Sequence, residues 1–148
     1  MRSVSILKFL IFIPLFIVSC SSSDKLDTGS NTPFENHKWT LKTLNNKKVV
    51  IPESGKDIYV IFKSDGNRAE GYGGCNNFFG SYKLNKNKIE LSKLASTEMF
   101  CESMMETESD FLRTLGITKK FKIKGNKLQL YDSSKIIATL EYTGVSDN

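Results

Sequence analysis

The chain has 148 residues, of which 39% are hydrophobic and 25% are charged. This composition is typical of one globular domain and excludes a disordered chain. The formal net charge is +5, and two of the 21 basic residues lie in the leader, so the excess of positive charge is too small to indicate nucleic-acid binding.

Residues 1–19 have the regions of a bacterial lipoprotein signal peptide. Two basic residues precede an almost entirely apolar run over 9–18. A helix over that run would reach about 15 Å, half of the roughly 30 Å of a bilayer core, so the run is too short to span a membrane. It ends in Ile17-Val18-Ser19-Cys20, which resembles a lipobox, although Leu is more usual than Ile17. We therefore expect cleavage before Cys20 and acylation of its thiol, palmitate included. The alternative is an ordinary secretory signal that ends near a cysteine.

Residues 20–33 are small, polar and without periodicity, which predicts a tether between the lipid and a folded domain over 34–144. The expected location is the cell envelope, at the periplasmic or surface face of a membrane. Ser21 fits outer-membrane sorting under a rule that does not hold in all bacteria.

The domain reads as short strands separated by turn signals, with Asp65-Gly66 as a hairpin turn because both residues tolerate positive φ. Lys120, Lys122 and Lys124 share one face of their strand, which is more simply a solvated face than a nucleic-acid groove. The predicted strands are 37–44, 48–51, 58–62, 68–74, 80–84, 88–91, 119–124, 127–131 and 136–142.

One segment, residues 102–115, has helical rather than strand periodicity. It places five apolar residues on one face, and Gly116 is positioned to end it. These residues are Met104, Met105, Phe111, Leu112 and Leu115. One helix on many antiparallel strands predicts an α+β fold, a β-rich antiparallel sheet or partly closed barrel with the helix packed on it.

Glu108 lies inside the apolar face of this helix, where an isolated carboxylate is costly. One interpretation is a perturbed acid in a functional site. The other, which we favour, is a carboxylate that cations or backbone donors satisfy and that holds the helix to the sheet.

Two cysteines remain after Cys20, and export would place both in a compartment where disulfides form. A Cys75–Cys101 bridge is the favoured interpretation, and two separate thiols or a metal pair are the alternatives. His37 is the single histidine, and no metal-ligand spacing occurs, so the sequence predicts neither a metal nor a cofactor.

An ordered set of motifs covering residues 36–142 resembles the META domain, the domain of HslJ-type heat-shock lipoproteins. Phe100 is a departure, because the resemblance leads us to expect a small residue such as Ala before Cys101. The motifs are Trp39-x-Leu41, Phe62-x-x-x-Gly66, Gly71-x-Gly73-Gly74-Cys75-Asn76-Asn77-Phe78-Phe79-Gly80-Ser81-Tyr82, Leu94-Ala95-Ser96-Thr97-x-Met99-x-Cys101, Met105-x-x-Glu108-x-x-Phe111-x-x-x-Leu115 and Leu128-x-Leu130.

The resemblance implies a compact β-rich fold with one helix, an envelope location, a role in stress and no established enzymatic activity. The glycine-rich stretch at 71–80 could be a phosphate-binding loop, but no Lys-Ser or Lys-Thr follows it, and a tight structural bend is the favoured interpretation. Its candidate residues are Gly73, Gly74, Asn76, Asn77 and Gly80.

No motif in the sequence indicates catalysis, so we expect a non-enzymatic, lipid-anchored protein that binds or scaffolds during envelope stress. Its partners would be the membrane, through the lipid, and an envelope protein or small ligand of unknown identity. The alternative is a periplasmic inhibitor of a hydrolase such as a lysozyme or protease. A hydrolase that uses Glu108 or Cys75 is a weaker third hypothesis, which a deep pocket around either residue would favour.

Overall fold

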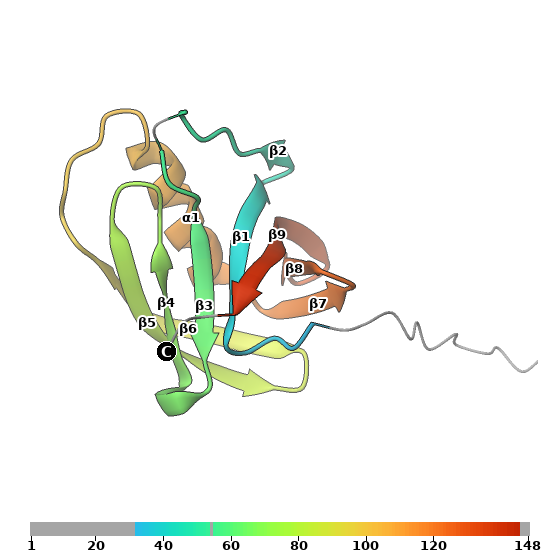
Figure 1. The fold of residues 1–148 in the computed structure, drawn as a ribbon. Helices are drawn as coiled ribbons and strands as arrows, with labels where there is room; N and C mark the ends of the chain where they lie inside the picture. The colour runs from blue at the N-terminus through green and yellow to red at the C-terminus, as the bar shows by residue number, and fades with distance from the viewer. Residues whose placement is uncertain (1–31, 54, 146–148) are drawn as a thin grey trace, which may run out of the picture.

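A computed structural model describes residues 32–53 and 55–145, which form an antiparallel sheet of nine strands in the order β2-β1-β3-β4-β5-β6-β7-β8-β9 (Figure 1). Residues 1–31 contain the predicted signal peptide, Cys20 and most of the predicted tether, so these features lie outside the described residues. The strands are β1 (His37–Leu44), β2 (Lys47–Lys48), β3 (Tyr59–Lys63), β4 (Arg68–Tyr72), β5 (Asn77–Asn85), β6 (Lys88–Ser96), β7 (Lys120–Lys124), β8 (Lys127–Asp132) and β9 (Lys135–Val145).

The sheet closes on itself because β1 pairs with β3 on one side and with β9 on the other. The short strand β2 adds to β1 alone, so eight of the nine strands form the barrel. The predicted α+β class, with a β-rich antiparallel barrel and one helix, is therefore confirmed.

The join between β6 and β7 is the weakest in the barrel, with a single register pair, Lys88 opposite Lys120. Helix α1 (Met105–Ile117) contacts β6 and β1. It buries Glu108, Phe111, Thr114 and Leu115 against the sheet. The helix thus contributes buried side chains to the core where β6 has no strand partner. Its position also brings Glu108 to the bend between β4 and β5.

Alternation along the strands fills the barrel with large apolar side chains, and Trp39, Phe62 and Phe78 are almost fully buried. Phe34 stacks between Phe62 and Phe121, with ring centroids 4.4 and 4.1 Å away, and thereby places the first described residues beside β7. The Tyr82 hydroxyl donates to the Glu35 carboxylate. Burial is the larger cause, and the Glu35 carboxylate the smaller cause, of a pKa of Tyr82 far above its usual value.

Several predicted boundaries are wrong. The helix begins at Met105 rather than residue 102 and runs through Gly116 to Ile117, where Thr118 ends it by donating from its hydroxyl to the Thr114 carbonyl oxygen. Met105 is 38% exposed, because its neighbour Met104 fills the core position instead. The strand predicted at 48–51 is reduced to β2, and the positive φ angles of the β3–β4 turn fall on Gly66 and Asn67.

Within the described residues, no helix is both long and apolar enough to cross a membrane.

Candidate functional site

The bend at residues 73–76 wraps around the carboxylate of Glu108. The Gly73 amide donates to the Asn76 carbonyl oxygen at 2.8 Å and closes the bend. The Cys75 and Asn76 amides both donate to Glu108 Oε2, at 2.9 and 2.6 Å, and Asn76 Nδ2 donates to Oε1 at 2.8 Å. Successive backbone N–H groups that converge on one oxygen form an anion-binding nest, here occupied by the protein's own acid.

Two glycines allow this approach. A Cβ at Gly73 would lie 2.6 Å from Glu108 Cγ, and Gly74 has a φ of +123°, which side-chain-bearing residues rarely adopt. Asn77 and Gly80 are not part of the bend, because β5 already begins at Asn77. The structure therefore brings together Gly73, Gly74 and Asn76 and separates them from the other two candidate loop residues.

Asn76 links the bend to the chain that leaves β6. Its side chain is 2% exposed, and its Oδ1 accepts from the Met99 amide at 2.7 Å and from the Thr97 hydroxyl at 2.8 Å. Its Nδ2 donates to the Met99 carbonyl oxygen at 3.0 Å as well as to Glu108. The Asn76 amide thus bonds both backbone groups of Met99, as a neighbouring strand would.

A disulfide joins Cys75 to Cys101, with the Cα atoms 5.7 Å apart. The structure thus contains the bridge that is the favoured interpretation of these two cysteines, in place of separate thiols or a metal pair. Within the described residues, no group of three or more acidic, histidine or cysteine side chains could hold a metal ion.

Residues 97–100, between the end of β6 and the disulfide-bonded Cys101, are exposed at every position. We call this stretch the 97–100 segment. Its backbone is fixed at Thr97, whose amide donates to the Asn77 carbonyl oxygen at 3.0 Å, and at Met99 through Asn76. The disulfide holds the next residue, Cys101. A fixed backbone with outward side chains leaves those side chains accessible to a binding partner.

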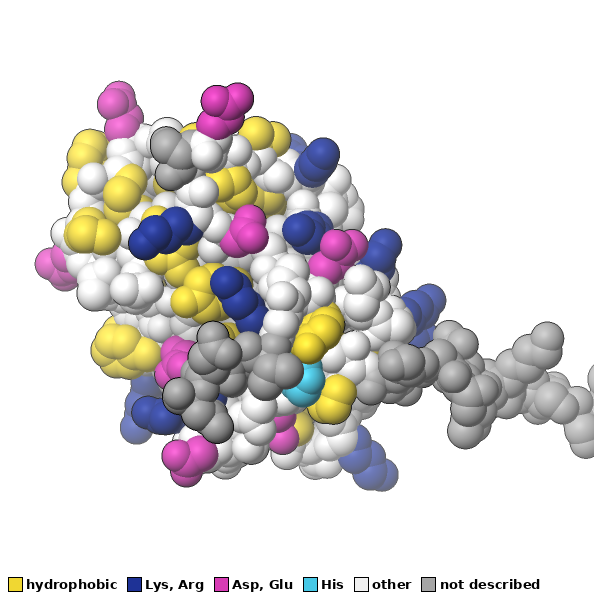
Figure 2. Space-filling model, in the orientation of Figure 1, with side chains coloured by type: hydrophobic (Ala, Val, Ile, Leu, Met, Phe, Trp, Pro, Cys, Tyr) yellow, Lys and Arg dark blue, Asp and Glu magenta, His cyan; other side chains and the backbone are white. Residues whose placement is uncertain are grey.

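The surface around the 97–100 segment is apolar with an acidic border. Phe100 is 81% exposed, Met99 57% and Met105 38%. Residues 94–112 contain four glutamates and one aspartate but no lysine or arginine, in a chain whose net charge is +5. Figure 2 shows hydrophobic side chains gathered along the edge where the β6–α1 connection lies in Figure 1.

The surface beside Glu108 bears on the hydrolase hypothesis, which a deep pocket would favour. The depression beside Glu108, lined also by Asn76 and residues 96–100, is shallow and holds about 290 Å³. Both oxygens of Glu108 accept hydrogen bonds from the bend, and the Cys75 sulfur is in the disulfide. The Glu108 carboxylate and the Cys75 sulfur thus both take part in holding the bend.

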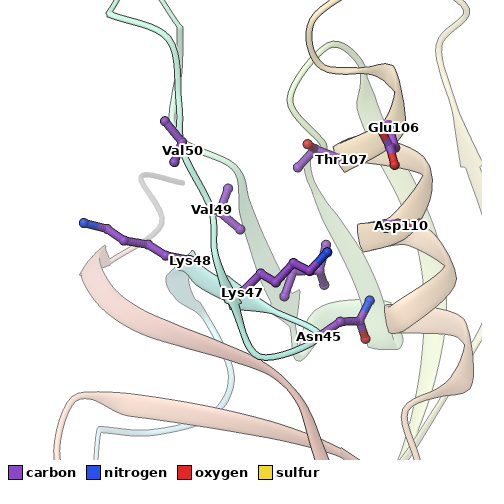
Figure 3. Close-up of a pocket in the computed structure, with 9 residues that line it drawn as sticks. Asn45, Lys47, Lys48, Val49, Val50, Glu106, Thr107 and Asp110 are labelled. Atoms are coloured by element: carbon purple, nitrogen blue, oxygen red, sulfur yellow. The ribbon is translucent and has the colours of Figure 1, made fainter.

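A second depression, of about 350 Å³, lies between β2 and α1 (Figure 3). Lys47 points from β2 toward the helix, where Glu106 and Asp110 lie, while Lys48 points away. Asp110 is already paired with Arg113. Charges of both signs line this depression, so its electrostatics favour neither an anion nor a cation.

The comparisons with known proteins agree with this architecture. The model of the META domain family matches residues 32–143. A solved structure of a protein from Burkholderia xenovorans is 23% identical, with a TM-score of 0.61 over 74% of this chain and 83% of that one. A second solved structure is 23% identical, with a TM-score of 0.56 over 74% of this chain and 89% of that one. At this identity both show the fold alone. No curated protein matches the chain significantly. Because the family model covers most of its length, the chain belongs to the META domain family.

Proposed function

We propose that this META-domain protein is a non-enzymatic, lipid-anchored protein of the cell envelope that binds another envelope protein through the 97–100 segment. The observation that supports the proposal is the exposure of Met99 and Phe100 on a backbone that Asn76, Glu108 and a disulfide hold in place. The backbone is held at three of the five residues from Thr97 to Cys101, which is more than a loop without a binding partner would need.

Binding is favoured by both the chemistry and the rigidity of this surface. Burying one Phe or Met side chain contributes about 1.5–3 kcal/mol. Little of this is lost to ordering the loop, because the backbone is already fixed before the partner arrives. Exposed aromatic and Met side chains are also enriched at protein interfaces. The acidic border adds a preference for a partner whose apolar site carries basic residues around it.

The envelope location and the lipid anchor rest on the sequence that ends at Cys20. A positive start, a short apolar run and a lipobox-like ending support cleavage and acylation there. The role in envelope stress rests on the family resemblance.

The alternative function, inhibition of a hydrolase, is favoured by one specific observation. No residue from 97 to 100 has a positive φ, and these residues form neither helix nor turn, so the exposed backbone is an open, irregular chain. A rigid, exposed segment with Phe100 outward is what an inhibitor that plugs the cleft of a hydrolase would need.

A photocrosslinking phenylalanine analogue tests the proposal in the full-length protein in its native envelope. At position 100 we expect a discrete crosslinked protein, which disappears when Met99→Ser is added. Position 79 is the matched control, because Phe79 is also exposed, at 61%, but lies on β5. Equal crosslinking at both positions, or none at position 100, would contradict the proposal. Mapping of the crosslink to the active-site cleft of a hydrolase would establish the alternative.

A further inference from the structure

A lysine-lined groove lies at the weak join of the barrel, where the β5–β6 hairpin meets the start of β7. Lys83, Lys88, Lys119 and Lys120 line it together with Leu84, Ile89, Asn85 and Glu90, around a volume of about 500 Å³. All four lysines are exposed. Among the described residues, none of the four is within ion-pair distance of an acid.

The pairing at this join is unfavourable for folding. Lys88 lies directly opposite Lys120, and like charges in that position destabilise a sheet. No acid among the described residues pairs with either. Glu90 lies opposite Lys83 on the neighbouring strand pair, which leaves four lysines against one glutamate. A repulsive pair at the weakest join is readily explained if an anion from outside the domain bridges the two lysines.

The floor of the groove is apolar. Leu84 is 40% exposed near the end of β5, and the buried Ile89 lies directly opposite it on β6. A basic border around an apolar floor matches the boundary of a bilayer, where anionic headgroups lie over acyl chains.

The position of the N-terminus connects this groove to the membrane. Phe34 stacks on Phe121 of β7, so the first described residues lie beside that strand (Figure 1). Residues 20–31 can span at most about 43 Å, which exceeds the roughly 30 Å width of a domain of this size. A lipid on Cys20 would therefore allow the groove to reach the headgroups.

We propose that the Lys83–Lys88–Lys119–Lys120 groove docks on anionic phospholipid headgroups of the membrane that carries the anchor. This inference rests on the proposed lipid anchor. The lipid would hold the protein at the membrane, and the groove would set its orientation. In Figure 1 the β6–α1 connection, which contains the 97–100 segment, lies on the side of the barrel away from the first described residues, so the docked protein presents that segment away from the bilayer.

Vesicle binding by the unlipidated chain tests the groove separately from the anchor. The protein is residues 20–148 with Cys20→Ser, which retains every described residue. The vesicles are phosphatidylcholine alone, or phosphatidylcholine with 30% phosphatidylglycerol. We expect binding to the anionic vesicles only, weakening as salt rises from 0.05 to about 0.5 M. Lys119→Glu/Lys120→Glu should reduce the partition coefficient about twentyfold or more, because two positive charges are replaced by negative ones.

The matched control is Lys48→Glu/Lys56→Glu, which makes the same change in net charge at exposed positions outside the groove. Folding of the groove variant is checked by thermal unfolding, and Lys120→Glu places an acid opposite Lys88, so its melting temperature should not fall. Lys120→Glu alone serves as the second variant. Equal losses in groove and control variants, or no binding to anionic vesicles at low salt, would overturn the proposal.

Self-association that depends on the groove, with vesicle binding unchanged, would also overturn it, since the acidic surface of a second copy would then be the occupant. The intact mass of the native membrane-extracted protein tests the anchor independently. A chain that begins at Cys20 with added acyl groups supports the anchor whatever the vesicles show.

Discussion

Replacement of Glu108 by glutamine is expected to lower the free energy of unfolding by about 3 kcal/mol. The carboxylate accepts two backbone amides and the Asn76 side chain within 2.9 Å, and it is 5% exposed. Glutamine keeps the volume but removes the charge from these bonds, and its NH₂ group must face one of the three donors. Urea unfolding monitored by Trp39 fluorescence measures the change.

Glu106→Gln is the matched control, because Glu106 lies on the same helix but is exposed. Its free energy of unfolding should stay within about 0.5 kcal/mol of the parent. If Glu108→Gln and Glu106→Gln unfold at the same urea concentration, the Glu108 carboxylate does not hold the bend, and the structural role given to it is wrong.

Removal of the disulfide by Cys75→Ala/Cys101→Ala is the second large effect. The bridge joins residues 26 apart, and its loss is expected to cost about 3.5 kcal/mol through the entropy of the unfolded chain. Small domains have a total stability of only about 5–15 kcal/mol. Thermal unfolding with and without a reductant gives the change directly.

The reductant itself provides the control. It should destabilise the parent protein and leave the double variant unchanged, since no bridge remains to be reduced. A parent whose unfolding is indifferent to reductant, under conditions where both thiols are then alkylated, would show that the bridge contributes no stability.

The class of fold could be predicted from the sequence because its signals are local. Alternation over residues 127–131 shows which side chains point inward, and turn residues between the runs indicate antiparallel neighbours. Alternation carries no information on which strands close a barrel. The pairing of β1 with β9, and the weak join between β6 and β7, come from contacts between residues far apart in the chain.

The candidate site was predicted in part. Glu108 stands out because a carboxylate interrupts an apolar helix face, and Cys75 and Cys101 stand out once export is inferred. Asn76 looked like an ordinary turn residue, since nothing near it in sequence shows that its amide bonds Met99.

The residue types alone also could not predict which apolar side chains are exposed and which are buried in the core. Met104 and Met105 are adjacent and chemically identical, yet the first is 7% exposed and the second 38%, because the helix begins between them. The lysines of the groove lie at 83–88 and 119–120, so only the folded barrel brings them to one surface.

The central claim is that the 97–100 segment is held rigid while its side chains are exposed, and amide hydrogen exchange of the native protein tests it residue by residue. The Thr97 and Met99 amides donate to Asn77 and Asn76, whereas the Glu98 and Phe100 amides donate to no atom among the described residues. We therefore expect exchange at Thr97 and Met99 to be slower than in an unstructured peptide by about a hundredfold or more, with Glu98 and Phe100 much less protected. Uniformly fast exchange at all four amides would show a mobile loop and contradict the account.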